Sequence, residues 1–258
     1  MDAQLMSTVA DGVATVTISH PARRNAMTAD MWRALPELLD GFAYDPSVRA
    51  VVLTGAGGTF CAGADITSLT GDDDPQALAV AAEDALAAFP KPTLAAVRGH
   101  CVGGGTQLAA ACDLRFAARD ALFGVTPARL GIVYPASSTR RLAALVGPAA
   151  AKYLLFSAEL IDGDRALRTG LVDELLPADL LDERVAAFTR VLAARSQLTQ
   201  AAAKEYAGGR TDRDGYWAAQ AAGSGDTAEG VAAFLERRDP AFTWTVPSPA
   251  AAARPTGG

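Results

Sequence analysis

Short apolar runs separated by turn residues mark the first half of the chain. Residues 6–9 and 13–18 flank Asp11-Gly12, and the second run alternates apolar and polar positions. An Asp-Gly pair between two such runs is a strong signal for a β-hairpin. Three further runs are short and largely apolar, which predicts buried strands at 49–54, 93–97 and 113–117.

Helical patterns lie between these strands. Thr28 is a candidate N-cap for a helix to about residue 44, and the apolar stripe of this helix comprises Met31, Leu35, Leu38, Leu39 and Phe42. A second helix is expected to end at Phe89, and a third opens at the glycine triplet 103–105 and ends near Ala111. The repeat of strand, glycine-rich turn and helix predicts an α/β fold with a largely parallel sheet under helical cover.

The second half of the chain is mostly helical in pattern, with one strand expected at 172–176. Residues 67–75 are polar, which predicts a mobile loop. Residues 245–258 are rich in proline, alanine and glycine, a composition typical of a disordered tail. The expected helices of this half are 137–145, 148–157, 163–169, 180–194, 197–207 and 226–237.

Composition and charge narrow the choice of partner. The formal net charge is −6 and there is no basic cluster, which disfavours nucleic acid. Three scattered cysteines and two histidines lack metal-ligand spacing, so we expect no metal site and a reducing compartment. Residues 1–10 lack the apolar core of a signal peptide, and no apolar run is long enough to span a bilayer. We therefore predict a cytoplasmic protein without a membrane partner.

Two glycine-rich turns follow strands, and neither has the residues of a nucleotide-binding loop. Phe60 occupies the place of the third glycine of a dinucleotide fingerprint, and Gly105 occupies the lysine position of a P-loop. Glycines beside a helix start instead let a ligand approach backbone N–H groups that carry partial positive charge. If the segments 60–66 and 103–105 converge, they can hold a carbonyl oxygen as it gains negative charge.

The motifs of the chain resemble the enoyl-CoA hydratase/isomerase (crotonase) superfamily over about residues 5–242. The resemblance is carried by five segments, Pro21 to Met27, Phe60 to Ile66, Arg98 to Gly105, Ile161 to Glu174 and Glu229 to Pro240. It implies a crotonase-like spiral of ββα units over 1–195. It further implies a C-terminal helical trimerisation region over 196–244, ahead of the tail at 245–258, and hence a homotrimer or a dimer of trimers.

The resemblance also assigns roles to residues. The backbone N–H groups of Ala64 and Gly104 would form the oxyanion hole for an acyl-CoA thioester. No cofactor is implied beyond the CoA moiety of the substrate. The positions implied in CoA binding are Ala22, Arg23, Arg24, Ala62, Asp65 and Ile66, with Phe234 and Arg237 contacting CoA across a subunit boundary.

Two departures from the family pattern change the expected chemistry. Hydratases of the family use two glutamates to place and deprotonate water, and this chain has Gln107 and Pro127 at those positions. A glutamine amide can form hydrogen bonds but cannot take a proton, and a general base must be titratable. Ordinary hydration or isomerisation therefore lacks both of its usual bases.

The segment 126–134 resembles the corresponding part of methylmalonyl-CoA decarboxylase. That branch also has proline at the second glutamate position, and Tyr134 matches a tyrosine that contacts the substrate carboxylate. It carries histidine, however, where this chain has Ala64. Decarboxylation needs no base, because cleavage of the C–C bond itself supplies the enolate electrons. The leading prediction is therefore an acyl-CoA lyase that decarboxylates a malonyl- or methylmalonyl-type CoA, with Ala64, Gly104, Gln107 and Tyr134 at its catalytic site.

Two other readings of the site stay open. The chain could be an enoyl-CoA hydratase or isomerase with a relocated acid–base group, supplied by Asp65, Tyr134 or a residue of the 67–75 loop. It could also be a non-catalytic acyl-CoA-binding protein or an oligomer scaffold that has lost its chemistry. A panel of enoyl-CoA and malonyl-type substrates separates these cases.

Overall fold

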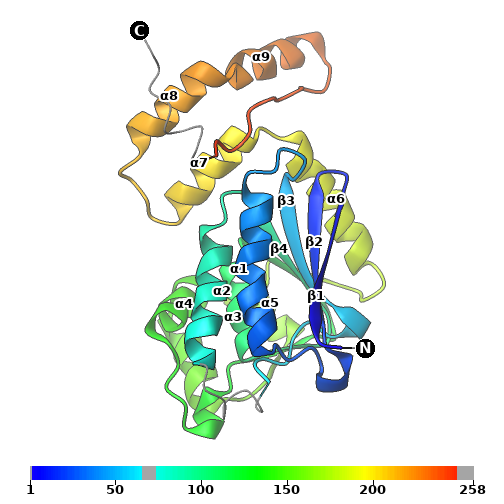
Figure 1. The fold of residues 1–258 in the computed structure, drawn as a ribbon, viewed down its shortest axis with the longest axis vertical. Helices are drawn as coiled ribbons and strands as arrows, with labels where there is room; N and C mark the ends of the chain where they lie inside the picture. The colour runs from blue at the N-terminus through cyan, green and yellow to red at the C-terminus, as the bar shows by residue number, and fades with distance from the viewer. Residues whose placement is uncertain (1, 66–73, 249–258) are drawn as a thin grey trace.

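A twisted, mostly parallel sheet forms the centre of the chain in the computed structural model, which describes residues 2–65 and 74–248 (Figure 1). Its strand order is β1-β2-β3-β4-β6-β9, and only the first pair is antiparallel. The Asp11-Gly12 turn joins that pair, as the sequence predicts, and both turn residues have positive φ. The strands are β1 (Gln4–Ala10), β2 (Val13–Ser19), β3 (Ala50–Gly55), β4 (Thr93–Val97), β6 (Leu114–Ala118) and β9 (Glu174–Leu176).

A smaller sheet of three short strands lies below the first, in the order β5-β7-β8. Its strands are β5 (His100–Val102), β7 (Leu122–Gly124) and β8 (Ile161–Asp162). Strands of two or three residues are too short to show a two-residue periodicity, so β5 and β8 were not predicted from the sequence. Single-turn 3₁₀ helices occur at Pro21–Arg23, Ala56–Gly58 and Pro127–Leu130.

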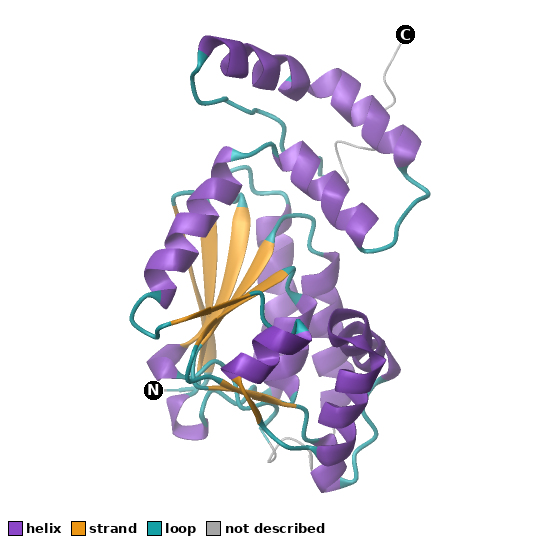
Figure 2. Cartoon of the chain, turned by 180° about the vertical axis from the view of Figure 1, so that it is seen from behind, coloured by secondary structure: helices purple, strands orange, loops and turns teal. Residues whose placement is uncertain are grey.

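Helices cover both faces of the large sheet, as Figures 1 and 2 show from opposite sides. One face packs under α1 (Ala29–Ala43), α2 (Pro75–Ala88) and α3 (Gly104–Ala111), and the other under α6 (Leu181–Ala194). Neighbouring strand residues divide between the two cores: Leu53 faces the α1–α3 side and Val52 faces α6. Strands buried on both faces read as continuous apolar runs, which is the pattern in the sequence.

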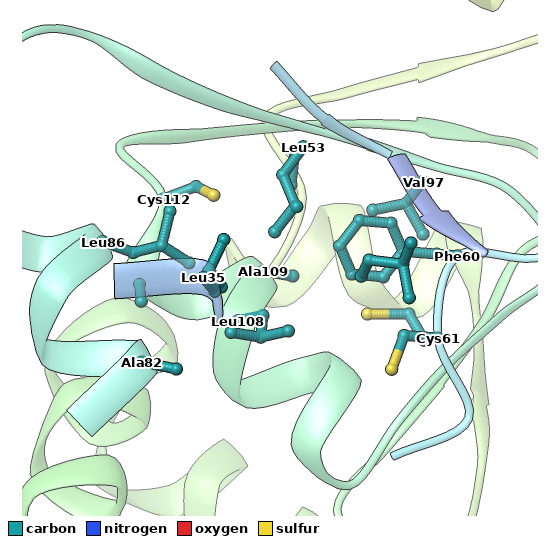
Figure 3. Close-up of a cluster of buried hydrophobic side chains, with 14 of the residues drawn as sticks. Leu35, Leu53, Phe60, Cys61, Ala82, Leu86, Val97, Leu108, Ala109 and Cys112 are labelled. Atoms are coloured by element: carbon teal, nitrogen blue, oxygen red, sulfur yellow. The ribbon is translucent and has the colours of Figure 1, made fainter. Parts of the chain in front are cut away.

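The larger core is centred on α3. Figure 3 shows Leu108 and Ala109 of this helix between Leu35 of α1, Leu86 of α2 and Leu53 of β3. All five side chains are buried. This packing fixes where α3 begins, and therefore where the glycine triplet at its start is placed.

All three cysteines belong to this buried core and none is in a disulfide. Burial raises the pKa of the Cys61 and Cys112 thiols to about 12, and that of Cys101 well above its ordinary value. Only the thiolate reacts with a disulfide reagent, so we expect no thiol to be titrated by Ellman's reagent in the native protein at pH 8. All three should react in guanidinium chloride, and a fast-reacting native thiol would contradict this burial.

Helices of the second half extend from the core to a separate C-terminal layer, visible above the sheet in Figure 1. Trp217, Trp244, Leu198 and Ala201 form a small buried cluster within that layer. None of the helices in the described ranges is both long and apolar enough to cross a membrane. The remaining helices are α4 (Ala136–Ser157), α5 (Gly163–Thr169), α7 (Gln197–Ala207), α8 (Asp214–Ser224) and α9 (Asp226–Glu236).

The predicted α/β architecture is confirmed, with local differences. The helices expected at 137–145 and 148–157 form one element, α4, bent at Gly147, where φ is 79°. The expected strand at 172–176 is shorter, because only 174–176 pairs with β6. Helix α8 was not predicted, since of its residues only Trp217 is buried and no apolar stripe marks it. The expected loop at 67–75 and the expected tail lie largely outside the described residues.

Candidate active site

The first predicted oxyanion segment runs between two neighbouring segments and is hydrogen bonded to both. Cys61 N donates to His100 O at 2.9 Å, and Val102 N donates back to Cys61 O at 3.0 Å. On the other side, Met27 N donates to Gly63 O at 2.8 Å, and Asp65 N donates to Met27 O at 2.9 Å. The N–H of Ala64 takes no part in either ladder. It is therefore left available for a ligand.

The second predicted segment forms the start of α3. Gly103 has φ 55° and ψ −118°, a conformation that favours glycine, and its N–H donates to Gly124 O at 2.8 Å. Gly104 is the first residue of the helix, so its N–H has no intrahelical acceptor. The two segments are close: a β-carbon added to Gly104 would lie 3.5 Å from Ala64 N, and one added to Gly63 would lie 3.4 Å from Gly104 N.

Ala64 and Gly104 line one cavity of about 200 Å³. Within the described ranges, neither Ala64 N nor Gly104 N donates to a protein acceptor. The positive end of α3 adds to their partial charge. This arrangement suits an oxygen that gains negative charge. The cavity is lined by Trp32, Ala62, Gly63, Ala64, Pro75, Gln76, Ala79, Gly103, Gly104, Gln107, Thr126, Pro127, Leu130, Ile132, Tyr134 and Pro135.

Gln107 lines the cavity from the first turns of α3, on the side away from solvent. Its amide nitrogen Nε2 donates to Glu83 Oε2 at 3.1 Å and to Ser138 Oγ at 2.7 Å. Ser138 Oγ in turn donates to Glu83 Oε2 at 2.5 Å. Arg141 forms an ion pair with the other oxygen of Glu83. Gln107 is therefore tied into a buried polar network behind the cavity.

Tyr134, which was predicted to be a catalytic residue, also lines the cavity. So does Pro127, which stands at the position of the second family glutamate. Burial raises the pKa of the Tyr134 phenol well above its ordinary value, and the nearby charge of Glu83 raises it further. The phenol therefore stays neutral at physiological pH and can act as a hydrogen-bond donor, not as a base. Pro127 has no titratable group, and none of the described residues that line the cavity carries a carboxylate.

The predicted CoA-binding loop packs beside the first oxyanion segment. Ala62 N donates to Arg24 O at 3.0 Å, and the side chains of Ala22 and Arg23 are exposed next to it. Asn25 holds this loop, since its buried amide donates to Ala56 O at 2.8 Å and to Thr59 O at 2.6 Å. The loop is thus held next to Ala62, which lines the cavity, and a contact of its arginines with CoA stays a prediction.

The other predicted CoA contacts have different outcomes. Asp65 is half-buried and directly follows Ala64, whereas Ile66 lies outside the described residues. Phe234 lies in the last turn of α9 and is 83% exposed, and Arg237 is the residue directly after this helix. Figure 1 places α9 at the opposite end of the molecule from the start of α2. One chain therefore does not bring these two residues to the cavity, and contact across a subunit boundary stays a prediction.

Glu83 was not predicted as a site residue from the sequence. It is 1% exposed and lies behind Gln107 on α2. A signal for it exists, because the buried positions Ala79, Ala82, Glu83 and Leu86 have the spacing of one helical face. A lone carboxylate on such a face requires a buried partner, and Arg141 supplies it.

Comparison with known proteins identifies the family. The enoyl-CoA hydratase/isomerase family model matches residues 8–245. The chain belongs to this family. Membership of this family is consistent with an acyl-CoA thioester as the ligand. The predicted superfamily is confirmed.

Members of the family resemble the chain over nearly its whole length. The crotonyl-CoA hydratase of Syntrophomonas wolfei is 36% identical over 246 residues, covering 89% of this chain and 94% of that protein. The 2,3-dehydroadipyl-CoA hydratase of Escherichia coli is 34% identical over 247 residues, with the same coverage. A crystal structure of an enoyl-CoA hydratase/isomerase family member matches with a TM-score of 0.90 and 38% identity, covering 96% of this chain and 99% of that one.

These relatives bear on the predicted reaction. Both curated proteins are named as hydratases, which supports the hydratase alternative better than decarboxylation. The local resemblance of residues 126–134 to methylmalonyl-CoA decarboxylase stays a prediction, as do the trimeric state and the boundaries at 195 and 244.

Proposed function

We propose that this family member adds water to a 2-enoyl-CoA thioester. The observation that carries the proposal is the pair of N–H groups, of Ala64 and Gly104, that face one cavity without a protein acceptor in the described ranges. Two such donors favour a thioester oxygen that gains negative charge over a neutral carbonyl. The names of the curated relatives support hydration as the reaction that follows.

In this reaction the thioester oxygen accepts hydrogen bonds from both N–H groups, which draws electrons from the double bond and leaves C3 electrophilic. Water adds its oxygen to C3, one proton goes to C2, and the net change is the addition of one water molecule. Gln107 lines the same cavity and can hold the water by a hydrogen bond. Because Gln107 and Pro127 stand where the hydratases of the family have their two glutamates, we expect slower turnover than with a glutamate base, by about 10²–10⁴-fold.

Decarboxylation of a malonyl-type CoA is the second candidate, and Tyr134 favours it. The neutral phenol of this residue lines the cavity and can donate a hydrogen bond to a substrate carboxylate. Loss of carbon dioxide would leave the C–C bonding electrons on the same enolate, in the same oxyanion hole. Protonation of C2 would complete the reaction.

The test offers crotonyl-CoA and methylmalonyl-CoA to the purified protein in parallel in deuterated water, with mass spectrometry of the products. We expect 3-hydroxybutyryl-CoA with deuterium at C2, and no propionyl-CoA. If the wild type forms deuterated propionyl-CoA and Tyr134→Phe does not, the protein is a decarboxylase and not a hydratase. Binding of CoA esters without any turnover would favour a non-catalytic acyl-CoA-binding protein.

A further inference from the structure

A buried carboxylate, that of Glu83, lies behind the cavity and contacts Gln107. Oε2 of Glu83 accepts hydrogen bonds from Gln107 Nε2 and from Ser138 Oγ, and Oε1 is paired with Arg141. A carboxylate paired with a guanidinium is an acceptor only. Glu83 therefore attracts the amide nitrogen of Gln107 and repels its oxygen.

Ser138 strengthens the same orientation. Its hydroxyl proton is donated to Glu83, so its oxygen can also accept from Gln107 Nε2, at 2.7 Å. Both protein acceptors of the Gln107 amide nitrogen therefore lie on the side of Glu83 and Ser138. Gln107 Oε1 has no protein donor within the described residues and is not among their enclosed polar atoms without a partner. It is the polar atom that Gln107 offers to the cavity.

We infer that Glu83 is a positioning residue that locks the Gln107 carboxamide with its oxygen toward the substrate. The group recognised at this point of the cavity is then a hydrogen-bond donor, such as water or a hydroxyl, and a carboxylate is disfavoured. The inference deepens the proposed function, on which it rests for the identity of the donor as the added water. It works against the decarboxylase candidate.

Glu83→Gln is the informative variant because it keeps the shape and reverses the polarity. Arg141 only donates hydrogen bonds, so the oxygen of the new amide turns toward Arg141. Its nitrogen then faces Gln107, whose carboxamide must flip and direct its own NH₂ group into the cavity. Asp84→Asn is the matched control: it removes the neighbouring carboxylate, which also pairs with Arg141 at 3.0 Å, on an exposed side chain.

Calorimetric titration with butyryl-CoA and malonyl-CoA, without any need for hydration, measures the preference. In the wild type we expect malonyl-CoA to bind about tenfold or more weakly than butyryl-CoA. Glu83→Gln should shift this ratio toward malonyl-CoA by about tenfold or more, and Asp84→Asn should leave it unchanged. Mass spectrometry after each titration checks that the thioester is intact. Equal wild-type affinities, or decarboxylation of malonyl-CoA by the wild type, would overturn the inference.

A double-mutant cycle separates the amide flip from a simple loss of charge. In the Gln107→Met background there is no amide to flip, so Glu83→Gln should no longer change the ratio. If the shift persists in that background, Glu83 acts by its charge alone and is not a positioning residue.

A measurement on the folded wild type tests the inference without any change at Glu83. The side-chain ¹⁵N resonance of Gln107, assigned by its absence in Gln107→Met, should show slow solvent exchange of the amide proton donated toward Glu83 and Ser138. Rapid exchange of both amide protons would place the NH₂ group in the cavity and sink the proposal. Because none of these readouts uses crotonyl-CoA, a protein that fails to hydrate can still meet or fail them.

Discussion

Replacing Ala64 by proline is expected to lower kcat for the hydration of crotonyl-CoA by about 10²–10³-fold, because it removes one of the two oxyanion donors. The substitution deletes a single N–H without deleting a ladder hydrogen bond. The bridge to Met27 uses Gly63 O and Asp65 N instead. The loss should therefore appear in turnover and not as unfolding, which circular dichroism and thermal melting of the variant would check.

Ala64→Ser is the matched control for this variant. It changes the side chain at the same position but keeps the N–H, so we expect kcat within a few-fold of the wild type. If proline and serine lowered kcat equally, the side chain at 64 and not the backbone donor would be responsible. If proline left kcat unchanged in a folded protein, the oxyanion hole would not include Ala64 N.

Gly105→Ala is expected to destabilise the protein by about 3 kcal/mol or more, since the added methyl would enter backbone that is already in contact. A β-carbon at Gly105 overlaps the carbonyl oxygen of Cys61 and lies 3.0 Å from its carbonyl carbon. That carbonyl accepts the hydrogen bond of Val102 N, so it cannot move aside without breaking a bridge. Denaturant unfolding would measure the loss, and activity should fall with it because the two oxyanion segments separate.

Gly41→Ala provides the comparison for the glycine substitution. Gly41 lies on the exposed side of α1, and an added β-carbon there meets no atom within 4 Å. Alanine is the better helix former by up to about 1 kcal/mol, so the same chemical change should stabilise the protein. A loss at Gly105 as small as the change at Gly41 would show that the approach of α3 to Cys61 is not tight.

Much of the fold is readable in the sequence because local rules agree with the tertiary packing. The Asp11-Gly12 turn places two residues at positive φ, where Asp and Gly are suited. The strands buried on both faces show as continuous apolar runs. The elements that were missed, β5, β8 and α8, are too short or too weakly patterned, and only the neighbours that pair with them or bury them define their limits.

The candidate site also contains residues that the sequence could predict and residues that it could not. Ala64 and Gly104 were predicted from the resemblance to the family, and for Gly104 the local backbone agrees, because the first residue of a helix has an N–H without an intrahelical acceptor. The network around Gln107 could not be predicted, since Glu83, Ser138 and Arg141 come from two other helices and meet only after these have packed. The orientation of the Gln107 amide depends on these contacts between helices.

By itself, the sequence determined the α/β class, the family through its motifs, and the absence of both family glutamates, and it predicted the two backbone donors from that resemblance. These are properties of periodicity, of glycine positions and of the residue type at a motif position, each of which is local. Only the tertiary structure decided that Gln107 turns its oxygen toward the cavity and that Glu83 is buried behind it. Hydrogen-bond direction depends on which acceptor lies opposite, and that partner is set by the packing of α2, α3 and α4.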